Sequence, residues 1–165
     1  LKLRGDEPAR SFANLYPKGQ ESKLRIGQPT IALGAALLEP PVLTVGRLAQ
    51  FGREIDNREF WLQTAPTIFG NSGGAVFLED TAQFIGVPAR ISVIMSGFAS
   101  ADAITHLSYI IPITRVYEFL DNQMFRFIYD SSFTEEGEKA AREAKRREDE
   151  LRLAAKETKG AIEES

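Results

Sequence analysis

The stretch that decides how this sequence folds is Phe69-Gly70-Asn71-Ser72-Gly73-Gly74-Ala75-Val76. A serine between glycines predicts a tight turn, where another molecule can approach the Ser72 hydroxyl and nearby backbone N–H groups closely. The N–H groups of Gly70 and Ser72 are candidates for an oxyanion hole, which stabilises negative charge on an acyl oxygen under attack. The same residue types are common in ordinary turns. The stretch alone therefore leaves a nucleophile turn and a plain loop equally open.

On both sides of this turn, short runs rich in β-formers alternate with Gly and Pro. They are Gln28–Ala35, Leu43–Phe51, Glu59–Thr64, Gly74–Leu78, Gln83–Ile94 and Leu107–Ile111. Six such runs predict an all-β sandwich or barrel. The segment Pro112–Leu120 then predicts a short amphipathic helix whose Ile113, Val116, Phe119 and Leu120 pack against the barrel.

The C-terminal segment has a different composition. Between Glu135 and Lys159, 16 of the 25 residues are charged, and strong helix formers dominate. Acid-before-base pairs four residues apart, such as Glu138/Arg142, favour one long exposed helix. Ser132 and Glu135 have capping-box spacing, and Gly160 is the expected helix end. A solvated charged helix is one interpretation, and a docking or coiled-coil face along its thin apolar stripe is the other.

Composition excludes several classes of chemistry. The 165 residues contain no cysteine and one histidine, His106, so thiol catalysis and metal sites built from two imidazoles are excluded. We therefore expect no metal and no cofactor. A net charge of −3 gives no general attraction to nucleic acid, and no apolar run is long enough to span a membrane. The visible chain is expected to be soluble, in a bacterial cytoplasm or periplasm or in a virus.

The turn and its neighbours resemble the trypsin-like serine proteases of chymotrypsin fold, and in particular their HtrA/Deg-like branch. The resemblance covers roughly residues 1–122. The matching motifs occur in the family's order: Gly27-Gln28-Pro29-Thr30-Ile31-Ala32-Leu33-Gly34, Thr44-Val45-Gly46-Arg47, Leu62-Gln63-Thr64, Gly70-Asn71-Ser72-Gly73-Gly74, Phe84-Ile85-Gly86 and Leu107–Ile113. This resemblance implies a six-stranded Greek-key barrel, the C-terminal half of a chymotrypsin-like double barrel.

The resemblance also implies roles for individual residues. Ser72 corresponds to the nucleophile, the N–H groups of Gly70 and Ser72 to the oxyanion hole, and Asn71 to a residue that shapes the turn. The substrate-binding residues that it implies are Thr67, Ile68 and Phe69 in the loop before the hole, and Val87, Ala89, Arg90 and Ile91 on a strand that pairs with a polypeptide substrate. No acidic residue lies in the approach to Ser72, so the pocket is expected to prefer small or aliphatic side chains.

The family's catalytic His and Asp lie on an N-terminal barrel, and Leu1-Lys2-Leu3 resembles the end of a strand that closely follows that Asp. His106 lies where the family has no catalytic residue, and we interpret it as a loop histidine. The expected organisation is a barrel with its closing helix over residues 1–122, a linker over 123–133, the charged helix over 134–159 and a tail over 160–165. The partner that this implies is a protease barrel that supplies His and Asp.

Two functions from different classes follow. The first is a serine endopeptidase, present here as the half that bears the nucleophile. The second is an inactive protease-like binding or structural module, which docks through the charged helix on a partner or on further copies of the chain. The sequence leaves both open.

Overall fold

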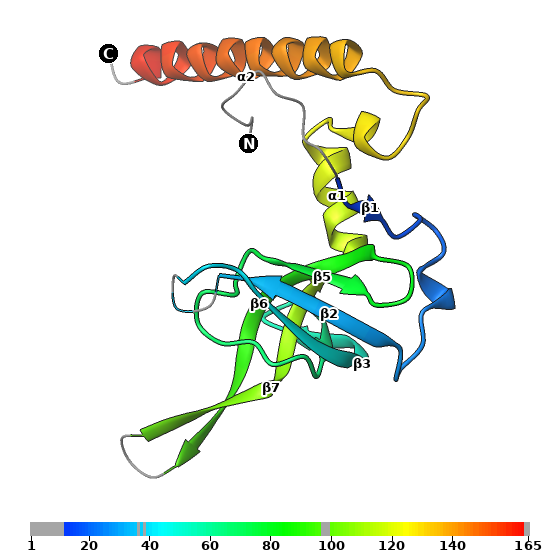
Figure 1. The fold of residues 1–165 in the computed structure, drawn as a ribbon. Coiled ribbons are helices and arrows are strands. Elements are labelled where there is room, and N and C mark those ends of the chain that lie inside the picture. Colours follow the sequence, from blue (N-terminus) through cyan, green and yellow to red (C-terminus); the bar gives the residue numbers. More distant parts are fainter. Residues whose placement is uncertain (1–11, 36, 38, 97–99, 164–165) are drawn as a thin grey trace. The chain divides into compact units, whose positions relative to one another are not determined.

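A computed structural model describes residues 12–35, 37, 39–96 and 100–163 (Figure 1). The segment Leu1-Lys2-Leu3 lies outside the described residues. The chain divides into two compact units, Leu1–Val116 and Tyr117–Ser165, with the division inside a helix. The first unit holds the strands, and the second holds helical structure. The expected boundaries at residues 122, 133 and 159 remain predictions.

The first unit is a closed antiparallel barrel of six strands. Its strands are β2 (Pro29–Gly34), β3 (Val42–Ile55), β4 (Arg58–Gln63), β5 (Ala75–Leu78), β6 (Gln83–Ser96) and β7 (Ser100–Pro112). Their spatial order is β6-β5-β2-β3-β4-β7, and pairing of β6 with β7 closes the barrel. Strand β5 returns beside β2, the first strand of the β2-β3-β4 meander, which makes a Greek key. The fold class expected from the sequence is confirmed.

All six predicted runs are strands, although several have different ends. The clearest difference is that β6 and β7 continue past their predicted ends as a two-stranded ribbon, which leaves the barrel in Figure 1. Register pairs Ser92 with Ile104 and Ser96 with Ser100 along this ribbon. Strand β1 (Asn14–Leu15), which pairs in parallel with the start of β6, was not expected from the sequence. Two residues are too few to produce an alternating pattern.

The barrel core is mostly apolar. Its most buried side chains include Ala32, Leu48, Val76, Leu78, Ile85 and Ile110. A two-residue turn joins β3 to β4 at Asp56 and Asn57, whose φ angles are 52° and 56°. Positive φ at both positions is the geometry of a type I′ hairpin turn, which matches the right-handed twist of the two strands. The turn therefore fixes the register that sets Arg58 opposite Ile55.

Helix α1 (Ile113–Asn122) follows β7 directly. Of the residues expected to pack inward, Ile113 is buried and Val116 and Leu120 are half-buried; Tyr117, which was not among them, is buried as well. The expectation that Phe119 faces the core is wrong, because its side chain is 60% exposed. At 3.6 residues per turn, Phe119 lies about 200° around the helix from Tyr117, so the two side chains cannot share a face.

The second unit has a short 3-10 helix, η3 (Arg126–Ile128), and the long helix α2 (Glu135–Glu163). Glu138 is nearly fully buried, and its carboxylate accepts hydrogen bonds from the backbone N–H of Arg126 and from the Arg126 guanidinium, at 3.0 and 2.6 Å. The Arg126 guanidinium also lies 3.9 Å from the centre of the Phe133 ring. Hydrogen bonding from Arg126, followed by its charge, holds the pKa of Glu138 below the usual glutamate value, although burial opposes this.

Arg126 makes the direct contacts with Glu138 and lowers its pKa most, but the charge of Arg142 also helps to lower this pKa, as the predicted Glu138/Arg142 pair implies. Arg126 binds the Glu138 carboxylate, whereas the Arg142 guanidinium donates to the Met124 carbonyl and stacks on Phe125. The exposed pair on α2 that the structure describes, Arg146 with Glu150 at 3.9 Å, has the base before the acid. Side-chain partners outside the helix outcompete neighbours one turn away, because a pair on an isolated helix contributes only about 0.2–0.5 kcal/mol.

Both expected ends of α2 differ from those observed. The hydroxyl oxygen of Thr134, rather than that of Ser132, accepts the N–H of Gly137 at 3.1 Å and caps the helix. Ser132 instead donates to Asp130. Helix α2 continues past Gly160 to Glu163, since a single glycine costs only about 1 kcal/mol inside a helix. Within the described residues, no helix combines the length and apolar character needed to cross a bilayer.

Candidate active site

The loop between β4 and β5 folds around the side chain of Asn71. The N–H of Asn71 donates to the Ile68 carbonyl at 3.1 Å, and its side-chain oxygen accepts the N–H of Ile68 at the same distance. Its carbonyl accepts the N–H of Gly74 at 3.0 Å. Asn71 is buried, so these bonds are shielded from water. Asn71 thus holds both ends of the turn that carries Ser72.

Two glycines in this turn are required by geometry. Gly70 has a φ of 98°, a backbone conformation that residues with a side chain rarely adopt. A Cβ on Gly74 would lie 2.2 Å from the Leu33 carbonyl oxygen on β2, which is far inside van der Waals contact. The glycines therefore allow the turn to lie against the barrel and to adopt its backbone path.

The turn leaves two N–H groups unpaired. The N–H groups of Asn71, Gly73 and Gly74 donate to the carbonyls of Ile68, Pro88 and Asn71. Those of Gly70 and Ser72 have no acceptor among the described residues. These are the two donors that the sequence analysis nominated for an oxyanion hole. An anionic oxygen placed between them would satisfy both.

A contact from the β2–β3 loop orients one of these donors. The carbonyl of Phe69 accepts the N–H of Leu37 at 2.8 Å. In a trans peptide the C=O and the following N–H point in opposite directions. The Gly70 N–H therefore points away from Leu37. Sequence reasoning missed Leu37, because it lies 33 positions from Gly70 and follows no motif.

The Ser72 hydroxyl is exposed and donates to the Ala89 carbonyl on β6 at 3.4 Å, while the Gly73 N–H donates to the Pro88 carbonyl at 3.0 Å. Ala89 is the extra residue of a bulge, because Pro88 pairs with Ile110 and Arg90 with Tyr109. The turn and this part of β6 are thus adjacent. A peptide carbonyl cannot remove the proton of a hydroxyl, so the contact does not activate Ser72.

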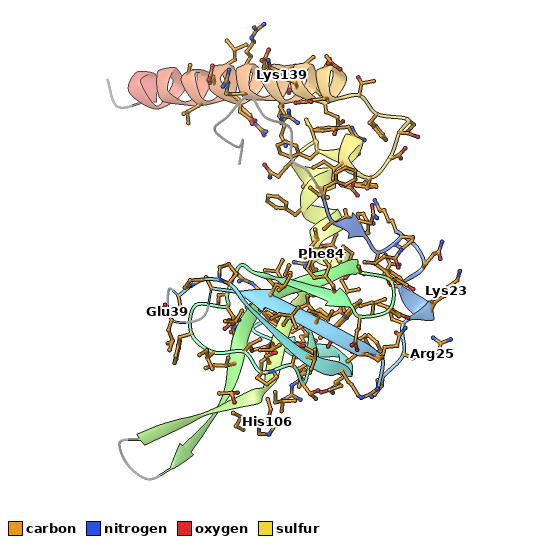
Figure 2. The ribbon with its side chains drawn as sticks, in the orientation of Figure 1. Lys23, Arg25, Glu39, Phe84, His106 and Lys139 are labelled. Atoms are coloured by element: carbon orange, nitrogen blue, oxygen red, sulfur yellow. The ribbon has the colours of Figure 1, made fainter. Side chains whose placement is uncertain are left out.

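An open hollow borders the turn on the side of the β2–β3 loop. It is lined largely by backbone and small side chains, including Gly34, Pro41, Gly70, Ser72 and Gly74. In Figure 2 the label of Glu39 marks the β2–β3 loop that borders this hollow. Because few side chains project into the hollow, a chain segment can reach Ser72 without displacing them.

The loop before the turn is anchored at its buried end. Thr67 is buried, and its N–H donates to the Thr105 carbonyl on β7 at 2.8 Å. Ile68 is half-buried, and the Phe69 side chain is 71% exposed. The Thr67 hydroxyl has no partner among the described residues. The loop thus runs from the barrel interior at Thr67 to solvent at Phe69.

A buried polar network holds the start of this loop. The side-chain amide of Gln63 donates to Ser108 at 2.8 Å and to the Ala65 carbonyl at 3.3 Å. Its oxygen accepts from the Ala65 N–H at 3.2 Å and from the Thr30 hydroxyl at 3.3 Å. One side chain therefore joins β4, β2, β7 and the loop. Gln63 belongs to the Leu62-Gln63-Thr64 motif, but this role does not follow from the motif.

The remaining predicted residues lie on β6 and β7. Val87, Ala89 and Ile91 are half-buried, and Arg90 is exposed. His106 is exposed on β7 and lies near the base of the ribbon in Figure 2. Within the described residues, Ser72 has no hydrogen bond to a histidine, and no three His, Cys, Asp or Glu side chains gather as a metal site would require.

Comparison with solved structures identifies the class of fold. The barrel is similar in fold to part of solved HtrA-type proteases. Two similar structures are described as "HtrA-type protease AlgW with tripeptide" and "HtrA-type protease AlgW with decapeptide", with TM-scores of 0.55 and 0.54. Each is 21% identical and covers 66% of this chain, whereas the match covers 34% and 32% of those proteins. This chain thus spans about a third of their length. No family model and no curated protein matches the sequence.

Proposed function

We propose that this chain is the nucleophile-bearing part of a serine endopeptidase of the HtrA type. Ser72 Oγ attacks the carbonyl carbon of a peptide bond and forms an acyl-enzyme with release of the amine. Water then hydrolyses the acyl-enzyme and frees Ser72. The substrate is a polypeptide whose backbone lies along β6, beside Val87, Ala89, Arg90 and Ile91.

The observation that carries this proposal is the pair of unpaired donors. Of five consecutive N–H groups from Gly70 to Gly74, three are used within the protein, and those of Gly70 and Ser72 are free among the described residues. Loss of one such donor in an oxyanion hole typically costs about 10²–10³ in rate.

The proposal requires a base from outside the described residues. The Ser72 hydroxyl contacts a peptide carbonyl, and this acceptor cannot take its proton. We assign the base and its orienting carboxylate to a His and an Asp of an N-terminal protease barrel. The 165-residue chain alone is then expected not to hydrolyse peptides, because the His and Asp of the N-terminal barrel are needed to activate Ser72.

Covalent labelling tests this function. A fluorophosphonate should label Ser72 in a protein that joins this chain to the N-terminal barrel, and Ser72→Ala should abolish the label. Ser132→Ala is the matched control, because Ser132 is exposed and its hydroxyl bonds Asp130 within its own turn. A folded two-barrel protein that takes no label at Ser72 contradicts the proposal.

The second candidate is a catalytically inactive module that docks through α2. It is favoured by the length of this helix, 29 residues, and by the exposure of Leu151 and Leu153, at 73% and 60%. Deletion of residues 134–165 should then change the oligomeric state or the captured partners, while the melting temperature of the barrel stays nearly constant. Unaltered assembly after the deletion contradicts docking through α2.

A further inference from the structure

The side chain that follows the Ser72 contact on β6 is a cation. The Ala89 carbonyl accepts the Ser72 hydroxyl, and the next residue, Arg90, has a side chain that is 42% exposed. We propose that Arg90 is a specificity-determining residue that binds an acidic side chain of the polypeptide substrate. This inference rests on the proposed endopeptidase function and adds the chemical class of the substrate.

Strand β6 has an open edge beside Ser72. Its pairing with β5 ends at Gly86, whereas its pairing with β7 continues through Val87 and Ile91. Along the other edge, the described contacts in this stretch are the bonds from Gly73 and Ser72 to the Pro88 and Ala89 carbonyls. An extended peptide can add to such an edge as a further strand. Its side chains would then pass Arg90.

An aromatic surface supports the Arg90 guanidinium, whose central carbon lies 5.3 Å from the centre of the Phe60 ring. Phe60 is buried and meets Tyr109 edge to face, with ring centres 6.1 Å apart. The Arg90 guanidinium is attracted electrostatically to the face of the Phe60 ring, so the Arg90 side chain has already lost rotamer freedom before a ligand binds. Less of that freedom remains to be lost on binding.

Asp56 leaves much of the guanidinium unused. Nη1 and Nη2 of Arg90 both donate to one oxygen, Oδ2 of Asp56, at 3.1 and 3.2 Å. The other three of the five N–H donors of an arginine have no acceptor among the described residues. Carboxylates prefer to accept two parallel N–H bonds from this fork. A substrate carboxylate can therefore take up the donors that Asp56 does not use.

Asp56 is also a weak competitor of a substrate carboxylate for the Arg90 guanidinium. Its side chain is 73% exposed and sits on the β3–β4 turn, and exposed ion pairs contribute about 0–1 kcal/mol to stability. A substrate carboxylate can join or displace it at low cost. Removal of the Asp56 charge should therefore strengthen the preference for acidic substrates, whereas removal of the Arg90 charge should abolish it.

The geometry also predicts where the acidic residue lies. In paired strands, side chains on one face come from alternate residues, and diagonal neighbours remain within reach of a long side chain. Only alternate positions of a bound peptide can therefore meet Arg90. A preference for acid at every position would reflect net charge instead.

Peptide binding tests the inference without turnover. The protein tested is the two-barrel protein carrying Ser72→Ala, and its binding of fluorescent peptides is measured by anisotropy. Each position of a neutral peptide is replaced in turn by Glu, and the same position is replaced by Gln as the uncharged control. Glu should bind about three- to tenfold more tightly than Gln at alternate positions, and less so at high salt.

Variants separate Arg90 from general electrostatics. Arg90→Gln should abolish the preference, Arg90→Lys should keep only part of it, and Asp56→Asn should increase it. Lys23→Gln is the matched loss of one positive charge, and it should change nothing. Lys23 lies on the opposite side of the barrel from Glu39, whose loop borders the Ser72 turn (Figure 2).

The outcomes are distinct. Equal binding of Glu and Gln peptides, or a preference that survives Arg90→Gln, overturns the role of Arg90 and leaves the endopeptidase proposal intact. Failure of every peptide to bind, together with no fluorophosphonate label at Ser72, overturns both. If Arg90→Gln does not fold, Asp56→Asn still tests the inference. This variant should show a stronger preference for Glu over Gln peptides, and an unchanged preference would contradict the role of Arg90.

Discussion

The Leu37 N–H donates to the Phe69 carbonyl at 2.8 Å and so orients the Gly70 N–H, one of the two donors available for an oxyanion. The β2–β3 loop thereby sets the geometry of a turn that is distant from it in the sequence. The contact uses only backbone atoms, so most substitutions at Leu37 preserve it. A substitution that removes the backbone donor is the exception.

Removal of the donor at Leu37 should disable the hole. Leu37→Pro removes the N–H, and its ring forces φ, which is 54° at Leu37, to about −65°. The Phe69–Gly70 peptide then loses its anchor, and labelling of Ser72 should slow by about tenfold or more. Leu37→Ala keeps the N–H and should label at the original rate. The measurement is the fluorophosphonate labelling rate of the two-barrel protein. Equal rates for both variants would show that the anchor has no effect on the hole.

Gly70→Ala should impair labelling more than it impairs folding. At a φ of 98° a Cβ costs about 1–2 kcal/mol, and relief of that strain would turn the Gly70 N–H away from the hole. The labelling rate should fall by about 10²–10³. Gly19→Ala is the matched control, since Gly19 has a φ of 81° and an added Cβ would meet no atom within 4 Å. It should lose stability to a similar degree and keep its labelling rate.

Gln63→Leu should destabilise the barrel. It leaves Ser108, Thr30 and the Ala65 N–H without the partner that Gln63 provides, and each unsatisfied buried group costs about 1–3 kcal/mol. Urea unfolding should show the loss as a lower midpoint. Gln50→Leu, at an exposed position of β3, should leave the midpoint nearly unchanged. A similar midpoint for both variants would contradict the structural role of the network.

The second unit should lose stability in acid. The pKa of Glu138 is lower in the folded state than in the unfolded state because Arg126 binds its carboxylate. Its contribution is therefore complete above the unfolded pKa of about 4.3 and disappears as the pH falls through the lower, folded value. Far-UV circular dichroism should show α2 melting more easily over this range.

Glu138→Gln should make the helix less stable at neutral pH and should flatten its pH dependence. Glu143→Gln, at an exposed position of the same helix, should retain the dependence. Identical acid profiles for wild type and Glu138→Gln would show that other carboxylates cause the transition.

Much of the barrel could be predicted from the sequence because its signals are local. Alternation of apolar residues and the positions of Gly and Pro located all six strands of the barrel. The ribbon and β1 were beyond this reasoning, since pairing between distant strands determines how far each one extends. The cap of α2 was misplaced by two residues because Ser132 and Thr134 are both good caps, and only the folded chain selects between them.

Some features of the candidate site likewise follow from the local sequence, and others follow only from the tertiary structure. The sequence by itself determined the turn at Ser72, since glycines at Gly70 and Gly74 are needed for its backbone path and close approach. Only the tertiary structure decided how the Gly70 N–H is oriented, through Leu37, and which β6 carbonyl accepts the Ser72 hydroxyl, at the Ala89 bulge. Those features come from contacts between segments far apart in the chain, and no local pattern encodes them.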